Sequence, residues 1–222
     1  MPDTHTADSD LVRITEVFYS LQGETRTVGI PTVFIRLTGC PLRCVYCDTE
    51  YAFSGGELYS VSQVVEQVAT YAPRYVTVTG GEPLAQKSCI SLLSMLCDAG
   101  YEVSLETSGA ISIADVDARV AKVVDLKTPG SKELERNDYS NIALLTTSDQ
   151  VKFVICDRQD YEWARSMLDQ YALPGRVSNV LFSPVRDSLD GAVLAHWIVE
   201  DNLPVRFQLQ LHKILWADQP GR

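Results

Sequence analysis

Three cysteines lie close together on one short segment of the chain. Cys40, Cys44 and Cys47 have the spacing C-x3-C-x2-C, while the other three of the six cysteines are scattered. Soft thiolates so close together can face one centre and are typical ligands of iron–sulfur clusters and zinc. A structural zinc site usually has four protein ligands, and nearby Asp48 is a poor fourth one. The spacing favours a four-iron cluster with one open iron over a zinc loop completed from a distance, or thiols without metal.

The elements that must position these cysteines alternate between strand and helix. Strands are predicted at 13–18, 32–37, 75–79, 102–106, 122–127, 150–156, 179–183 and 205–211. Helices are predicted at 61–72, 89–100, near 112–120, 159–171 and near 190–201. Ser60 and Gln63 form a plausible capping box for the first helix. This alternation indicates an α/β fold with a parallel sheet covered by helices.

About six strand–helix units are too few for a closed eight-stranded barrel. We therefore predict an open, partial TIM-like (β/α) barrel. Residues 1–222 are predicted to form one domain, with residues 1–10 as a loose tail.

Several residues with useful chemistry follow the predicted strands. Parallel strands end on one rim, where α/β proteins bind ligands. This rim is predicted to carry the cysteines, Gly80-Gly81-Glu82, Glu106, Lys127, Ser183 and His212. Glu106 can receive or donate a proton, and His212 can orient a substrate or metal-bound waters. Taken alone, His212 is better explained as a structural histidine.

The overall composition narrows the class of protein. Nineteen basic and 29 acidic residues among 222 give a net charge of −10 and argue against direct nucleic-acid binding. The N-terminus lacks a signal peptide pattern, and no apolar run is long enough for a membrane span. A soluble cytoplasmic protein is therefore expected. Cys89, Cys97 and Cys156 are predicted to be buried core thiols.

Two motifs together resemble the radical S-adenosylmethionine (SAM) superfamily. They are the cysteine motif with Tyr46 before its last cysteine, and TGGEP at 79–83. The resemblance implies a [4Fe-4S] cluster on the three cysteines, with SAM chelated by the open iron. It also implies that Tyr46 lies against the adenine and Gly81 near the methionyl amino group.

Further segments resemble the 7-carboxy-7-deazaguanine synthases within that superfamily. They are EVFYSLQGE (16–24), FIRLTGCPLRC (34–44), CDT (47–49), LETSG (105–109) and LQLHKILW (209–216). The resemblance implies a lyase of queuosine biosynthesis that converts 6-carboxy-5,6,7,8-tetrahydropterin to 7-carboxy-7-deazaguanine with loss of ammonia. It further implies an electron donor such as flavodoxin or ferredoxin, Mg²⁺, and a homodimer.

The same resemblance assigns roles to individual positions. Substrate binding is expected of Leu21, Gln22, Gly23, Arg36 and Thr79, and Mg²⁺ binding of Thr49. SAM contacts are expected of Tyr46, Cys47, Asp48, Gly81, Asp125, Leu126, Lys127 and Ser183. The residue chemistry agrees, since arginine can grip a carboxylate bidentately and a threonine hydroxyl is a hard ligand suited to Mg²⁺.

The chain also departs from the family pattern. Within Asp125-Leu126-Lys127 only the lysine matches, Thr25 stands where glycine is expected, and Pro220 is the candidate for a terminal substrate-contacting proline. Two rivals remain: a radical SAM activase, which needs neither LQGE nor LQLHK, and a zinc-binding interaction module.

Overall fold

Nine strands of the described residues form one open sheet. The computed structural model describes residues 10–217, 219 and 221, and the strand order is β3-β1-β2-β4-β5-β6-β7-β8-β9. The bounds are β1 Leu11–Leu21, β2 Pro31–Leu37, β3 Glu57–Ser60, β4 Tyr75–Gly80, β5 Glu102–Thr107, β6 Ala121–Asp125, β7 Gln150–Ile155, β8 Asn179–Pro184 and β9 Arg206–Phe207. From β2 to β9 all neighbours are parallel, whereas β1 runs antiparallel to β2 and β3. The predicted open, partial barrel is confirmed.

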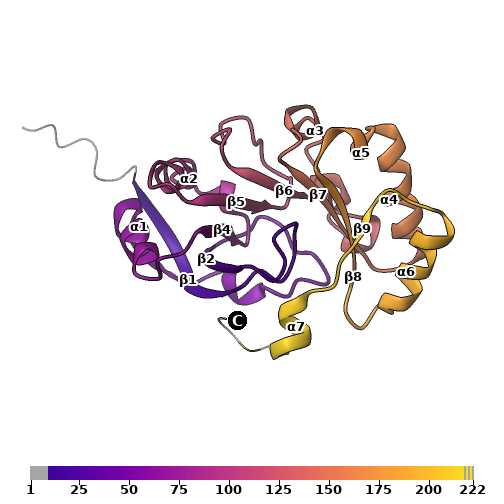
Figure 1. Ribbon diagram of the computed structural model, residues 1–222, viewed down its shortest axis with the longest axis horizontal. Coiled ribbons are helices and arrows are strands. Elements are labelled where there is room, and N and C mark those ends of the chain that lie inside the picture. Colours follow the sequence, from indigo (N-terminus) through magenta and orange to yellow (C-terminus); the bar gives the residue numbers. More distant parts are fainter. Residues whose placement is uncertain (1–9, 218, 220, 222) are drawn as a thin grey trace, which may run out of the picture.

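Helices lie along the outside of this sheet and close to its open side. They are α1 Val61–Ala69, α2 Cys89–Asp98, α3 Asn141–Leu144, α4 Arg158–Gln170, α5 Leu173–Arg176, α6 Gly191–Glu200 and α7 Leu211–Trp216. In Figure 1, α1 and α2 lie beside the β1–β4 end of the sheet, α4 and α6 beside the β8–β9 end, and α7 between the two ends. The predicted capping box of α1 is confirmed, since Ser60 and Gln63 exchange side-chain and backbone hydrogen bonds.

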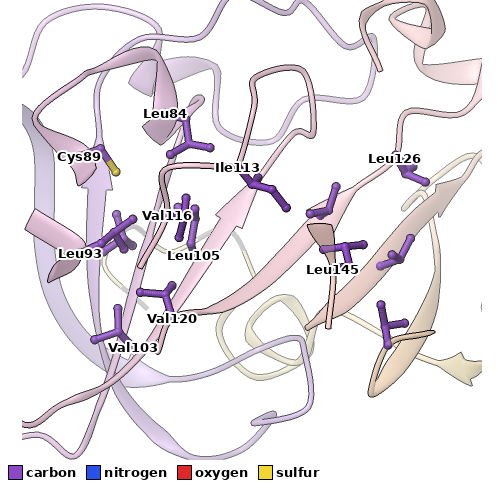
Figure 2. Close-up of a cluster of buried hydrophobic side chains, with 14 of the residues drawn as sticks. Leu84, Cys89, Leu93, Val103, Leu105, Ile113, Val116, Val120, Leu126 and Leu145 are labelled. Carbon is purple, nitrogen blue, oxygen red and sulfur yellow. The ribbon is translucent and has the colours of Figure 1, made fainter. Parts of the chain in front are cut away.

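Alternate residues of the strands build the core. On β2, Val33, Ile35 and Leu37 are fully buried, because side chains two apart in a strand point to the same face. Figure 2 shows part of this core, where apolar side chains of α2, β5 and the segment 113–120 meet. The remaining side chains of the strands point to the other face, which is the face that can carry a site.

The helix predicted near 112–120 is wrong: the segment consists of turns. Ile113, Val116 and Val120 are buried at helix-like spacing. Polar side chains capture the backbone instead, as the Asp117 carboxylate accepts from the N–H of Arg119 at 2.9 Å. Such local bonds favour turns over a helix.

The strand predicted at 205–211 is also wrong beyond Phe207. The strand β9 covers Arg206–Phe207, and α7 begins at Leu211. His212 therefore lies on a helix and does not end a strand. Residues 1–9 of the predicted tail, together with Pro220, lie outside the described residues.

Candidate active site

A cavity of about 890 Å³ lies at the carboxyl ends of the parallel strands. Almost all of the predicted site residues line it, namely Leu21, Gln22, Gly23, Arg36, Cys40, Cys44, Tyr46, Cys47, Asp48, Thr49, Thr79, Gly81, Glu106, Asp125, Lys127, Ser183 and His212. The exception is Leu126, whose side chain is fully buried in the apolar core (Figure 2). The structure thus brings together residues from six strands, from the loops that follow β1, β2, β4 and β6, and from α7.

Strand alternation explains why polar side chains reach this cavity. Arg36 on β2 is paired in register with Thr79 on β4, and both line the cavity. The Thr79 hydroxyl donates to Glu106 Oε2 at 3.3 Å, so β5 continues the same row. A guanidinium, a hydroxyl and a carboxyl therefore stand side by side on three adjacent strands.

The cysteine loop follows β2 and packs against two other loops. The N–H of Val45 donates to the carbonyl of Ser131 at 3.2 Å, and the N–H of Arg43 donates to Glu133 Oε1 at 2.5 Å. A Cβ at Gly81 would lie 2.2 Å from the carbonyl oxygen of Gly39, immediately before Cys40. The cysteine loop and the TGGEP turn therefore touch through backbone.

The donor set fits an iron–sulfur cluster. Cys40, Cys44 and Cys47 are all partly exposed toward the cavity. Burial raises the pKa of each thiol, that of Cys44 to about 11, so the free thiols stay protonated and metal binding must drive their deprotonation. Within residues 10–217, 219 and 221, no three His, Cys, Asp or Glu side chains surround a single-ion site.

Unpartnered polar atoms beside the cysteines fit a polar ligand such as SAM. Asp125 Oδ1 and Ser183 Oγ are buried without a hydrogen-bond partner in the described structure, and both residues line the cavity. Lys127 Nζ pairs with the other oxygen of Asp125 at 2.9 Å. Since buried polar groups are normally satisfied, these two atoms indicate where a bound molecule supplies hydrogen bonds.

The guanidinium of Arg36 is held from one side. Its Nε pairs with Glu16 Oε1 at 2.7 Å, and the Tyr51 hydroxyl donates to the same oxygen at 2.9 Å. The guanidinium also lies over the rings of Phe18 and Tyr51, 5.8 and 5.7 Å from their centroids. These contacts fix the orientation of the arginine fork at the cavity wall.

Thr49 and Asp48 form a small oxygen-rich corner. The Thr49 hydroxyl donates to Asp48 Oδ1 at 2.8 Å, which leaves its lone pairs for another partner. Lys213 of α7 pairs with Asp48 Oδ2 at 2.8 Å. The hard oxygen of Thr49 fits the predicted Mg²⁺, and Asp48 ties α7 to the cysteine loop.

Gln22 is wholly occupied by protein contacts. Its Nε2 donates at 3.2 Å to both Thr77 Oγ1 and Glu106 Oε1, and its Oε1 accepts from the N–H of Glu24 at 3.1 Å. The amide of Gln22 therefore orients the LQGE loop and Glu106.

Two carboxyl groups in the cavity have opposite pKa shifts. Burial disfavours the charged form of Glu24, but the charge and hydrogen bond of Lys152, together with the hydrogen bond from Gln210, lower its pKa. Burial, followed by the negative charge of Glu24, raises the pKa of Glu106. One carboxyl is thus held ionised while its neighbour is favoured as an acid, a division typical of acid–base sites.

His212 packs directly on the LQGE loop. A Cβ at Gly23 would lie 2.2 Å from His212 Nδ1, so only glycine allows this approach. The N–H of Leu211 donates to the Gly23 carbonyl at 2.9 Å. Burial lowers the pKa of His212, which favours a neutral imidazole at the cavity wall.

Several polar residues that line the cavity were not predicted from the sequence, among them Glu24, Lys152, Gln210 and Lys213. For Lys152 a signal existed, because a lysine inside the apolar run QVKFVI is as unusual as the arginine inside VFIRL. Cys89 is fully buried as expected. Cys156 is not a core residue, since it is partly exposed and lines the cavity.

The comparisons with known proteins agree with this geometry. Residues 34–172 match the Radical SAM superfamily model. The chain is 43% identical to the 7-carboxy-7-deazaguanine synthase of Koribacter versatilis, covering 94% of this chain and 98% of the relative. It is 40% identical to that of Chlorobaculum tepidum, covering 92% and 94%. The crystal structure of QueE from Escherichia coli shares the fold, with a TM-score of 0.72 and 22% identity over 94% of this chain and 100% of that one. The chain therefore belongs to the radical SAM superfamily and, within it, to the 7-carboxy-7-deazaguanine synthase family.

Proposed function

We propose that this chain converts 6-carboxy-5,6,7,8-tetrahydropterin to 7-carboxy-7-deazaguanine with release of ammonia, as a radical SAM lyase of the queuosine pathway. One observation carries the proposal. The three cysteines and the row of Arg36, Thr79 and Glu106 line one cavity, in a chain related over nearly its whole length to curated synthases of that name. The cavity volume of about 890 Å³ is large for a ligand site.

Each group of residues has a separate task in this function. Cys40, Cys44 and Cys47 would hold the cluster, while Asp125 and Ser183 would offer their unpartnered polar atoms to SAM. When bound, the cluster and SAM together supply one-electron chemistry and hydrogen-atom abstraction. The protein binds and orients the pterin and excludes water.

Loss of ammonia needs a proton for the leaving nitrogen and a base for a carbon-bound proton. We assign the first task to Glu106 and the second to Glu24, since both line the cavity and their environments shift their pKa values in opposite directions. The Gln22 amide, bonded to the Glu24 backbone and to the Glu106 carboxyl, fixes the two groups relative to each other. Thr49 would hold Mg²⁺, which would supply positive charge for the substrate carboxylate.

The test is a direct assay of the protein. Anaerobically reconstituted enzyme is incubated with SAM, a reductant, Mg²⁺ and the carboxy-tetrahydropterin, and the products are analysed by mass spectrometry. 7-Carboxy-7-deazaguanine is the expected product. Its absence from protein with a full iron complement would refute the substrate assignment.

Replacing Arg36 by lysine is expected to raise KM for the pterin by about 10- to 100-fold, because lysine keeps the charge but loses the bidentate fork. Iron content should not change, since Arg36 contacts the Glu16, Phe18 and Tyr51 side chains and no cysteine. Arg74→Lys is the matched control, as Arg74 forms an exposed pair with Glu102. A KM for R36K equal to that of R74K would contradict the assigned carboxylate contact.

The proposal extends to how the enzyme exists in the cell. We propose one catalytic domain spanning the chain, a homodimer, a cytoplasmic location and an electron donor of the flavodoxin or ferredoxin type. No helix within the described residues is long and apolar enough to cross a membrane.

A further inference from the structure

Lys152 places a buried positive charge in the wall of the active-site cavity. It lies on β7, and three strands (β4, β5 and β6) separate it from β2, which carries Arg36 and leads into the cysteine loop. Its ammonium forms an ion pair with Glu24 Oε2, and the two side chains are only 14% and 11% exposed. This contact joins the middle of β7 to the LQGE loop, 128 positions away in the sequence.

The surroundings of Lys152 are strongly acidic. Burial disfavours its ammonium, but Glu24 first, and then Asp125 and Glu106, raise its pKa. Of these carboxyl groups Glu24 is in direct contact. Glu24 Oε1 is held as well, by a 2.8 Å hydrogen bond from Gln210 Nε2. Both oxygens of Glu24 therefore have fixed donors, and its carboxylate faces the cavity in one orientation.

We propose that Lys152 is a positioning residue that fixes Glu24 as the carboxylate of the site and thereby leaves Glu106 as the carboxyl that holds the proton. This inference rests on the proposed function. Among the described residues, the donors that contact the Glu106 carboxyl are the neutral groups of Gln22 and Thr79, whereas Glu24 contacts the ammonium of Lys152. The positive charge of Lys152 also acts on Glu106, but its direct ion pair is with Glu24, and this contact distinguishes the two carboxyl groups.

A second buried pair in the same sheet provides a comparison. Lys122 Nζ lies 3.1 Å from Asp149 Oδ1, with side chains 7% and 0% exposed. Lys122 lies at the start of β6 and Asp149 just before β7, so this pair sits at the opposite end of the strands from the cysteine loop. Neither residue lines the cavity. The pair stabilises the sheet but has no contact with the site.

The experiment compares Lys152→Met, Lys152→Arg, the double variant Lys152→Met/Glu24→Gln and the control Lys122→Met. For each protein, the iron content, the midpoint of thermal unfolding, and kcat and KM for the pterin are measured. The ratio of 7-carboxy-7-deazaguanine to 5′-deoxyadenosine is measured as well, because it separates hydrogen abstraction from the later proton transfers.

K152M is expected to lower kcat by about 30-fold or more, since it leaves a buried carboxylate without its partner. The ratio of product to 5′-deoxyadenosine should also fall. K152R should recover most of kcat and most of this ratio, because it keeps the positive charge. The double variant removes the unpaired charge, so it should recover the unfolding midpoint without recovering the ratio. K122M should lower the unfolding midpoint and leave the ratio unchanged.

Two results would overturn the inference. One is recovery of the product ratio together with the unfolding midpoint in the double variant, which would make the pair purely structural. The other is a fall of the ratio in K122M as large as in K152M. If the wild-type protein forms no deazaguanine at all, the proposed function fails instead, and the two failures are thus distinguished.

Discussion

Glu82→Ala is expected to lower the free energy of unfolding by about 3–5 kcal/mol, because it leaves several buried donors without an acceptor. Glu82 is fully buried. Its Oε1 accepts from the N–H of Leu84 at 3.0 Å and from the Thr107 hydroxyl at 2.9 Å. Its Oε2 accepts from the N–H of Ser108 at 2.7 Å and from the hydroxyl of the same residue. Glu82, the glutamate of TGGEP, therefore links the turn after β4 to the turn after β5 by hydrogen bonds.

Equilibrium denaturation of the cluster-free protein measures this loss without any effect of metal binding. Glu82→Gln keeps one acceptor oxygen and should lose less. Glu66→Gln, on the exposed face of α1, is the control and should change the unfolding free energy by less than about 0.5 kcal/mol. An E82A value close to that of E66Q would show that the neighbouring turns can satisfy the freed donors by themselves.

The sequence predicted the parallel part of the fold well because each signal there is local. Strands such as β4 are short, apolar and bounded by turn residues, and their order in the sequence is nearly their order in the sheet. The location of the cavity was predicted from one rule, that the carboxyl ends of parallel strands lie at the same rim of the sheet. Arg36 was assigned through the resemblance to the synthases, and the ability of arginine to grip a carboxylate bidentately agreed with that role.

The parts that were missed depend on contacts between distant segments. Nothing local to Glu24 reveals Lys152 as its partner, and the pairing appears only once β7 and the LQGE loop are placed in the same barrel. Similarly, α7 is only six residues long, too short for helical periodicity to be decisive, and its position depends on contacts with Gly23 and Asp48. The turns at 112–120 show the opposite error, since helical spacing there reflects burial alone.

Gly81→Ala is expected to reduce product formation by about 100-fold or more, because displacing catalytic groups by about 1 Å has effects of that size. A Cβ at this position would lie 2.2 Å from the Gly39 carbonyl oxygen and 2.7 Å from Cys40 Cβ. Both contacts involve the cysteine loop, and a backbone oxygen cannot rotate away as a flexible side chain can. The N–H of Glu82 also donates to the same Gly39 oxygen at 2.9 Å, so relief of the clash must move the loop that begins at Cys40.

The displaced loop gives this variant a signature that separates it from simple unfolding. Iron content after reconstitution and SAM affinity should both fall, while β4 and its parallel neighbours still form. Gly175→Ala is the matched control, because a Cβ at Gly175 meets no atom within 4 Å, and it should retain wild-type iron content and activity. Full iron content and SAM affinity in G81A would mean that the cysteine loop can move without weakening iron or SAM binding. The close approach of Gly81 to Gly39 would then not position the cluster.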